Sequence, residues 1–366
     1  MNTKASGAGN AAKYISRAWT RYSFIFVFFI ILIVYAITVT ANGNVFKWSH
    51  FAAILSSQNT VIVGTVALGM AMVIITGQID LSVGSALVMC TGACIIVFNM
   101  TNNVILMLLG AVAAGALCGL VNGVLVGYAK MPPFIVTLGT MLIYRSVTLS
   151  LVRTIDPALT GSTSSQFSMD SSLSSYEFLR MQFGTGSLDI GISLPYITFL
   201  FLLMLVIMVI LSKSTKYGKS VYAVGSNEKT AQLVGINVQA VKMSVFILIG
   251  VLVGVGSFVQ ACKIGNVTPA SSGKSYEMYA IAAVVLGGVS MAGGRGNLLG
   301  VFFGALSYTT INFIIVSIPS LSTDIQDTFQ GLVLIAVIFV QTVGPVVKER
   351  LLAIRRRRKA TEQSPT

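Results

Sequence analysis

Two Gly-Lys-Ser triplets are the clearest candidates for nucleotide chemistry in this chain, at residues 218–220 and 273–275. A phosphate-binding loop of the G-x-x-x-x-G-K-[ST] type needs another glycine five residues earlier, where the backbone folds around the phosphates. Lys213 stands at that position for the first triplet, and Thr268 for the second. Neither triplet follows a strand pattern, so we expect no nucleotide or other cofactor to be bound by this chain.

Other reactive groups are too few or too scattered to form a catalytic or metal site. Cys90, Cys94, Cys118 and Cys262 lie mostly within apolar runs, and no histidine or further cysteine completes a metal set. The single histidine, His50, has no carboxylate cluster around it in the sequence. We therefore predict apolar packing roles for the cysteines and no metal, and a membrane enzyme is a weak interpretation.

The composition shows what kind of element must carry the remaining polar residues. The chain has 366 residues, of which 55% are hydrophobic and 10% charged, whereas soluble domains carry about 25% charged residues. This excess of apolar residues indicates a bilayer as the second solvent. Hydropathy predicts an all-α integral membrane protein with about ten spans. They cover residues 24–39, 57–76, 82–98, 104–129, 134–152, 194–212, 241–261, 278–291, 297–318 and 329–347.

The positive residues are distributed unevenly between the two sides that ten spans would define. With both termini in the cytoplasm, 17 Lys and Arg residues fall inside and 5 outside. This distribution predicts a cytoplasmic tail (1–23), one transmembrane domain (24–347) and a basic cytoplasmic tail (348–366). The "RRRRK" run in the last segment is interpreted as an anchor near anionic membrane lipid rather than as a nucleic-acid arm. The first span has no clear cleavage site after it and is interpreted as an uncleaved anchor.

Two connections are long enough to have roles of their own. The outer loop 153–194 has 42 residues, is rich in Ser, Thr and Gly, and is either a docking surface or a variable solvated loop. The inner segment 213–240 contains Ser226 or Asn227 as a helix N-cap and Gly235 as a left-handed stop. These signals predict a short cytoplasmic helix over residues 228–234.

Polar residues inside or beside the spans are candidates for a solute pathway. Asp80 and Ser82, in "GQIDLSVGS", either cap the next span or line a helix break, and we favour the cap. Arg145 lies well inside a span, where it is a functional candidate unless it snorkels outward or pairs with a buried carbonyl. The candidates are Asn59, Thr60, Asp80, Ser82, Asn122, Thr137, Arg145 and Asn312. Bonding between helices is the commoner use of such amides and hydroxyls.

Four stretches, in this order, resemble the sugar-type ABC importer permeases, the ribose/galactose/xylose family of bacterial inner-membrane proteins. They are "GQIDLSVGS", "PPFIVTLGTMLIYRS", "TKYGKSVYAVGSNEKTAQLVGINV" and "YEMYAIAAVVLGGVSMAGGRGNLLGVFFGAL". The resemblance implies about ten helices, broken or short near residues 77–85 and 287–300, and a dimer of permease chains. It also implies a periplasmic solute-binding protein and a cytoplasmic ATP-binding subunit that holds ATP and Mg.

The resemblance further implies that the inner segment docks on the partner ATPase. The coupling residues would be Ser226, Asn227, Glu228, Lys229, Thr230, Ala231 and Gly235. Similar proteins have Glu-Ala-Ala where this chain has Lys229-Thr230-Ala231, so the detailed contacts are expected to differ. Many relatives also have Gly-Gly-Ile-Asp where this chain places Gln78 beside Asp80.

The function expected from these features is import of a monosaccharide or a similar small polar solute by alternating access. The alternative is an ion- or proton-coupled secondary transporter that works without ATP. That alternative lacks an acidic relay in the middle of the spans and leaves the resemblance unexplained. The solute itself, and whether two identical or two different permease chains pair, remain open.

Overall fold

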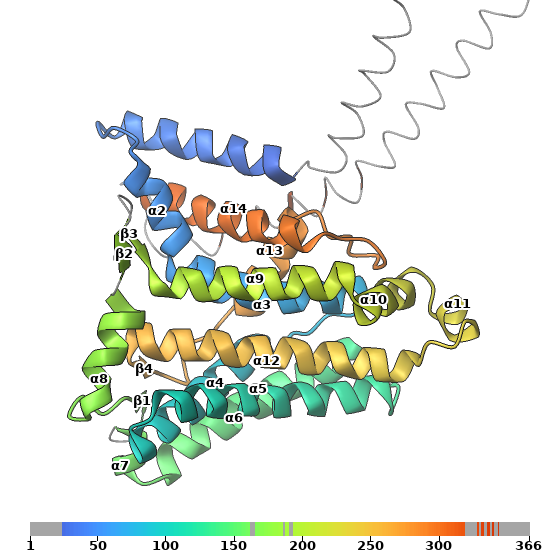
Figure 1. The fold of residues 1–366 in the computed structure, drawn as a ribbon, viewed down its shortest axis with the longest axis horizontal. Coiled ribbons are helices and arrows are strands. Elements are labelled where there is room, and N and C mark those ends of the chain that lie inside the picture. The colour runs from blue at the N-terminus through green and yellow to red at the C-terminus, as the bar shows by residue number, and fades with distance from the viewer. Residues whose placement is uncertain are drawn as a thin grey trace, which may run out of the picture.

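Eight long apolar helices dominate the computed structural model, which describes residues 24–161, 165–185, 187–189, 193–318 and scattered positions between 328 and 343. These helices are Phe24–Ala41, α3 (Gln58–Ile75), α4 (Val83–Thr101), α5 (Val104–Gly127), α6 (Pro133–Thr154), α9 (Tyr196–Ser214), α12 (Val238–Ile264) and α14 (Leu298–Val316). Eighteen residues of helix span about 27 Å, close to the roughly 30 Å hydrocarbon core of a bilayer. The chain is thus an all-α integral membrane protein, as its sequence predicts (Figure 1).

Shorter elements connect the long helices or cover their ends. The helical ones are α2 (Trp48–Ser56), α7 (Pro157–Thr160), α8 (Ser174–Leu179), a π-helical turn (Arg180–Thr185), α10 (Lys216–Ser226), α11 (Glu228–Leu233) and α13 (Tyr276–Leu286). The strands are β1 (Phe167–Ser168), β2 (Ser187–Asp189), β3 (Ser193–Pro195) and β4 (Asn266–Val267). Both strand pairs are antiparallel, β1 with β4 and β2 with β3.

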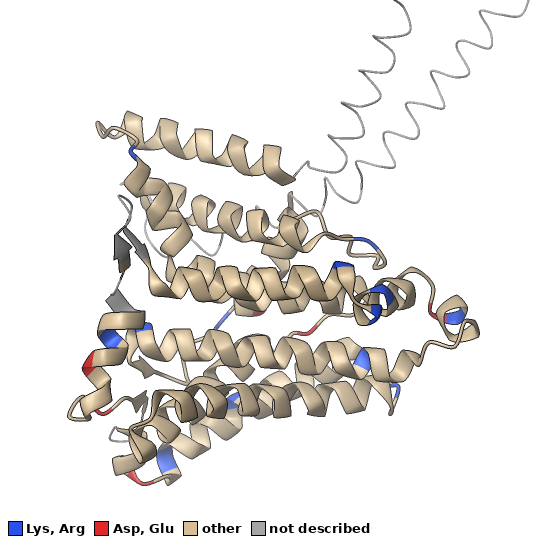
Figure 2. Ribbon diagram, viewed as in Figure 1, with Lys and Arg blue, Asp and Glu red and all other residues tan. Residues whose placement is uncertain are grey.

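The two ends of the bundle are called inner and outer here, after the expected sides of the membrane. The inner end carries α10 and α11, with Lys130, Lys213, Lys216, Lys219, Lys229, Lys242 and Arg295 (Figure 2). The outer end carries α8, with Lys47, Arg153, Arg180 and Lys263. This unequal distribution of cations agrees with the predicted orientation. Both chain termini and most of the tenth predicted span, 329–347, lie outside the described residues.

Closely packed glycines bring α5 and α12 together as antiparallel neighbours. A Cβ added to Gly115 would lie 2.1 Å from the carbonyl oxygen of Gly250, and one added to Gly119 would lie 2.2 Å from that of Phe246. Only glycine allows two helix backbones to approach so closely, as is common between membrane helices. The spacing of glycines in the two sequences therefore sets the register of the central helix pair.

Helix ends follow local signals in the sequence. The side chain of Asn103 accepts the Ile105 and Leu106 N–H groups at the start of α5, and Asn237 accepts the Ala240 N–H in the first turn of α12. Pro133 opens α6, and Gly265 ends α12 with a φ of +80°. These are the usual means of satisfying or ending the free backbone groups of a helix.

The predicted helix breaks are present, and one predicted span is wrong. Residues 76–82 and 287–297 are not helical, as expected. The eighth predicted span, 278–291, is instead the 11-residue helix α13, preceded by a segment that runs inward from β4 to the middle of the bundle (Figure 1). The polar composition of residues 268–275 suggested an outer loop, but contacts with α4 and α6 hold this segment inside the bundle. The other eight described spans agree with the helices to within three residues at each end.

The long outer loop is folded against the helices. The side chain of Asn99 in α4 donates to the Leu159 and Ser168 carbonyls, at 2.9 and 3.0 Å, and accepts the Asp170 N–H at 2.9 Å. The Arg180 guanidinium donates to the Lys263 carbonyl at the end of α12. The part of this loop that the structure describes is therefore an ordered cap, whose function is a matter for experiment.

Candidate functional site

The inner end has a projecting helix that matches the predicted short helix closely. The Asn227 side chain accepts the Thr230 N–H at 2.9 Å and so caps α11, and Gly235 ends this turn of chain with a φ of +85°. Leu233 and Val234 at its tip are 86% and 71% exposed. Figure 1 shows α11 beyond the ends of the long helices, so these apolar side chains stand free of the bundle.

The helix before α11 is α10, which the sequence did not predict. It connects the projecting helix to the two helix breaks, residues 76–82 and 287–297. A Cβ on Gly225 would lie 1.7 Å from the Ile75 carbonyl oxygen and 2.8 Å from the Gly294 nitrogen. The Gly294 N–H donates to that same Ile75 oxygen at 2.8 Å. The Tyr222 hydroxyl donates to the Gly296 carbonyl at 3.1 Å. Burial raises the pKa of the Tyr222 phenol, so this donor keeps its proton at physiological pH.

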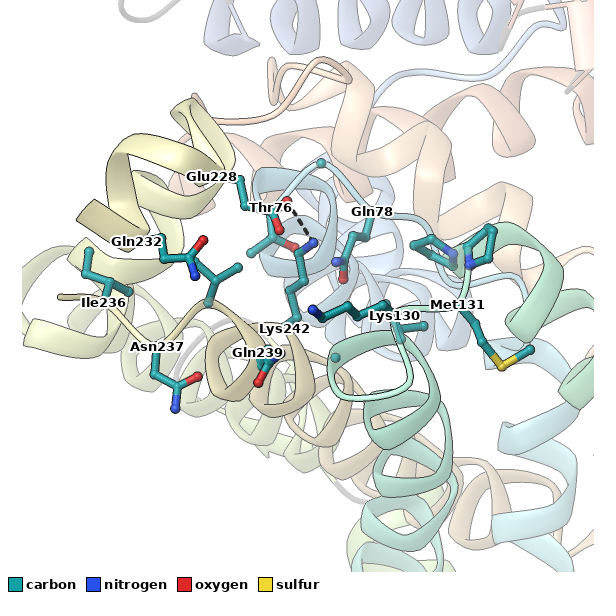
Figure 3. A pocket seen from close by; sticks show the side chains of 16 residues that line it. Thr76, Gln78, Lys130, Met131, Glu228, Gln232, Ile236, Asn237, Gln239 and Lys242 are labelled. Atoms are coloured by element: carbon teal, nitrogen blue, oxygen red, sulfur yellow. Dashed lines mark hydrogen bonds and ion pairs between the residues drawn. The ribbon is translucent and has the colours of Figure 1, made fainter. Parts of the chain in front are cut away.

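A cavity of about 680 Å³ opens between α11 and the helices behind it (Figure 3). Its walls come from the break after α3, the turn between α5 and α6, and the start of α12. Glu228 and Lys242 form an ion pair of 2.8 Å within it. The Glu228 side chain is 56% exposed, so this ion pair stabilises the fold by at most about 1 kcal/mol. Besides its two ends, α11 is attached through Ala231, which is buried in the main hydrophobic core.

A buried polar network joins the first helix break to α5. The Ser82 N–H and hydroxyl both donate to Asp80 Oδ1, at 2.8 and 2.6 Å, and Asn122 Nδ2 donates to Ser82 Oγ at 2.8 Å. The Tyr144 hydroxyl donates to the Cys118 carbonyl beside them at 2.9 Å. The predicted capping of α4 by Asp80 and Ser82 is therefore wrong. Ser82 occupies the N-cap position, but its hydroxyl is held by Asp80 and Asn122 instead of bonding the first turn.

Arg145 pairs with carbonyl groups inside the bundle, one of the two non-functional roles considered for it. Its Nη1 donates to the Pro269 carbonyl at 2.7 Å and also to that of Ser272. Both carbonyls belong to the re-entrant segment, defined here as residues 268–275. The opposite side of this segment packs against α4, since a Cβ on Gly84 would lie 2.3 Å from the Gly273 oxygen. Arg145 thus holds the re-entrant segment at the level of the middle of α6.

The remaining pathway candidates do not join this network. Thr60 is buried and bonds the Ile54 carbonyl (2.6 Å) and the Thr309 hydroxyl (2.8 Å). Thr137 is buried and bonds the Pro133 carbonyl one turn back in α6 at 2.9 Å. Asn59 is exposed in the first turn of α3, and Asn312 is half-buried in α14. Thr60 and Thr137 therefore bond elsewhere, whereas Asp80, Ser82 and Asn122 are bonded together.

Two positions with clear structural roles carried only weak sequence signals. Gly225 looked like an ordinary loop glycine, although its missing side chain allows α10 to touch α3. Lys274 was placed in an outer loop, yet it stands exposed on the re-entrant segment. A positive charge directly before an apolar helix of only 11 residues could have suggested a half-span.

The fold and these sites together define a class of protein. A bundle of long apolar helices with two breaks, a re-entrant segment and a projecting inner helix is the architecture of a multi-pass membrane permease. The family that matches residues 52–338 is described as "Branched-chain amino acid transport system / permease component". Because the match covers most of the chain, this protein belongs to that family.

Similar proteins of known annotation are import permeases. The ribose import permease protein RbsC of Escherichia coli (strain K12) is 33% identical over 82% of this chain and 87% of its own length. The autoinducer 2 import system permease protein LsrC of Yersinia enterocolitica is 33% identical over 84% and 79%. The galactose/methyl galactoside import permease protein MglC of Escherichia coli (strain K12) is 30% identical over 78% and 84%. No solved structure matches the chain.

Proposed function

We propose that this chain is the transmembrane subunit of an ATP-binding cassette importer in a bacterial inner membrane. It moves a monosaccharide or a similar small polar solute into the cytoplasm. The similar permeases are named for ribose, galactose and methyl galactoside, and autoinducer 2, although the family description names amino acids. The proposed partners are a cytoplasmic subunit that binds ATP and Mg, a second permease chain and a periplasmic solute-binding protein.

The observation that carries this proposal is the apolar tip of α11. Leu233 and Val234 are 86% and 71% exposed at the inner end of the bundle, beyond the long helices. Apolar side chains on a projecting helix in water support a protein partner that covers them. A cytoplasmic ATPase fits the basic surroundings and the family, and Glu228, Lys229 and Thr230 would form the polar rim of the contact.

The contacts of α10 support a route for motion from the partner to the spans. Through Gly225, α10 touches both the end of α3 at Ile75 and the turn at Gly294. A displacement of α11 would therefore reach the two helix breaks at the same time. The breaks would then change the exposure of the pathway between the outer and inner sides, while the binding protein supplies the selectivity.

Co-purification tests the proposal directly. The tagged chain is solubilised from native membranes in mild detergent, and associated proteins are identified by mass spectrometry. The wild-type chain is expected to recover an ATPase with Walker motifs. Leu233→Asp is expected to lower that recovery about tenfold or more, because burying a leucine contributes about 1.5–3 kcal/mol and a buried carboxylate opposes it.

Val45→Asp is the matched control, because Val45 is 71% exposed in the outer-end segment between the first helix and α2. It should leave ATPase recovery unchanged. Equal recovery with Leu233→Asp and the wild-type chain would refute the docking role of α11. Recovery of the chain without any ATPase, from cells that still accumulate solute, would favour a secondary transporter.

A further inference from the structure

An exposed lysine stands at the depth of the middle of the membrane. Arg145, which binds the re-entrant segment, lies about 18 Å along α6 from Pro133 and about 14 Å from Thr154. Gly273 packs against Gly84 in the first turn of α4, which itself begins inside the bundle. Lys274 follows directly and is exposed. Its position is therefore fixed from two sides, far from both ends of the long helices.

Neither lipid nor a carboxylate among the described residues stabilises the Lys274 charge. A lysine that faces hydrocarbon at mid-depth costs several kcal/mol. Among the described residues, none forms an ion pair with Lys274. The nearest acid in sequence, Glu277, lies against Gly84, where a Cβ would be 2.7 Å from its Oε2, and its charge interacts with Arg145. Water, a polar solute or a polar surface of the proposed second permease chain is the environment that suits an ammonium group here.

The surface around Lys274 differs from the other exposed surfaces at this depth. Ser271, on the same segment, is exposed as well, and Met278 follows at 55% exposure on the first turn of α13. By contrast, Leu142 on α6 and Val206 on α9 are exposed apolar residues at mid-helix positions, as expected of lipid contacts. The exposed residues Ser271 and Lys274 of the re-entrant segment are therefore polar, whereas Met278 beyond them and the mid-helix residues Leu142 and Val206 are apolar.

We propose that the re-entrant segment lines the solute pathway and that the ammonium group of Lys274 contacts the passing solute. The ammonium group donates hydrogen bonds to hydroxyl, carboxylate or phosphate oxygens and repels cations. The pathway thus favours neutral or anionic solutes rich in oxygen acceptors. This inference rests on the proposed function as a permease, because it assigns the pathway of that same transporter.

Thiol labelling tests whether this surface is aqueous. In membranes that contain the full chain, Lys274→Cys is treated with the anionic reagent 2-sulfonatoethyl methanethiosulfonate, and modification is read as protection from a later maleimide mass tag. Val206→Cys is the lipid-facing control, and Ser171→Cys, exposed on the outer loop, is the aqueous control. The four native cysteines are buried and free, so their background labelling should be low.

Lys274→Cys should react at least about tenfold faster than Val206→Cys and approach the rate of Ser171→Cys. Equal, slow rates at positions 274 and 206 would overturn the proposal, because they would place the segment against lipid or a dry protein contact. This readout is independent of the ATPase. If labelling fails while α11 still recovers its partner, only the pathway assignment is lost.

A second labelling pair tests the charge itself. Ser271→Cys is labelled with the anionic reagent and with a trimethylammonium methanethiosulfonate, first with Lys274 present and then with Lys274→Gln. For charges about 7 Å apart in water, Coulomb's law predicts that the anion-to-cation rate ratio falls about sevenfold when the lysine is removed. An unchanged ratio would show that Lys274 does not set the potential of the pathway.

Discussion

Replacing Gly225 by alanine should separate the inner-end helix α10 from the two helix breaks. The new Cβ would lie 1.7 Å from the Ile75 carbonyl oxygen, whereas ordinary contact begins at 3.4 Å. Because the obstacle is backbone, no side-chain rotation relieves the clash, and α10 must move by about 1.7 Å. The bond from the Tyr222 hydroxyl of α10 to the Gly296 carbonyl would then stretch beyond hydrogen-bond distance.

The expected loss of stability follows from these two effects. Overpacking of this size costs about 1–3 kcal/mol, and alanine returns up to about 1 kcal/mol by its higher helix propensity. A net loss of about 1–2 kcal/mol should lower the unfolding midpoint in detergent by about 1–3 °C for a chain of 366 residues. Because α11 and its apolar tip are unchanged, binding of the ATPase should persist. The ATP hydrolysed per solute transported should rise instead.

Gly139→Ala is the matched control for this prediction. Gly139 lies within α6, and a Cβ added there meets nothing within 4 Å. The same chemical change should therefore leave stability and coupling unchanged or raise stability slightly. A Gly225→Ala protein with the wild-type unfolding midpoint and the wild-type ratio of ATP to solute would refute the rigid attachment of α10.

Three further substitutions test the interior of the bundle. Asn122→Ala should lower the free energy of unfolding by about 1–3 kcal/mol, since it removes the donor to buried Ser82 Oγ, and denaturation in detergent measures this loss. Arg145→Gln should lower the free energy of unfolding by about 1–3 kcal/mol in the same assay, because the Pro269 and Ser272 carbonyls lose their guanidinium donor. Gly250→Ala should cost about 1–3 kcal/mol or more, because its Cβ would lie 2.1 Å from a carbonyl of α5.

For each of these three predictions, one outcome would contradict the structural reason behind it. Asn59→Ala removes an exposed amide of the same type, so equal unfolding curves for it and Asn122→Ala would argue against the buried network. An unfolding curve of Arg145→Gln equal to that of the wild-type chain would show that the Arg145 bonds do not hold the re-entrant segment. A Gly250→Ala chain as stable as Gly139→Ala would contradict the close approach of α5 and α12.

The long helices could be predicted because, in a chain with so few charged residues, a long run of apolar residues indicates a membrane span. A run of eighteen or more apolar residues favours a membrane span whatever its neighbours are. The short helix α11 could be predicted for a different reason, since Asn227 and Gly235 act on the backbone beside them. Both signals are local, so no knowledge of the tertiary packing was needed.

Elements whose position depends on distant contacts were missed. The glycines in "KYGKSVYAVGS" argue against a helix, yet α10 is present, and Gly225 allows it to pack against Ile75, 150 residues earlier in the chain. Similarly, the composition of residues 268–275 is that of a surface loop. Its depth is fixed by Arg145 of α6 and Gly84 of α4, and no local pattern reports those contacts.

Contacts between neighbouring elements connect the projecting helix α11, the two helix breaks and the segment that carries Lys274. The turn after α13 contacts α10 through Gly294 and Gly296, while the start of α13 carries the re-entrant segment with Lys274. Eleven residues of helix form a rod of about 16 Å between these two points. If α11 docks on a partner ATPase as proposed, its displacement would pass through α10 to the end of α3 and to the turn after α13, while Arg145 and Gly84 hold the re-entrant segment in place.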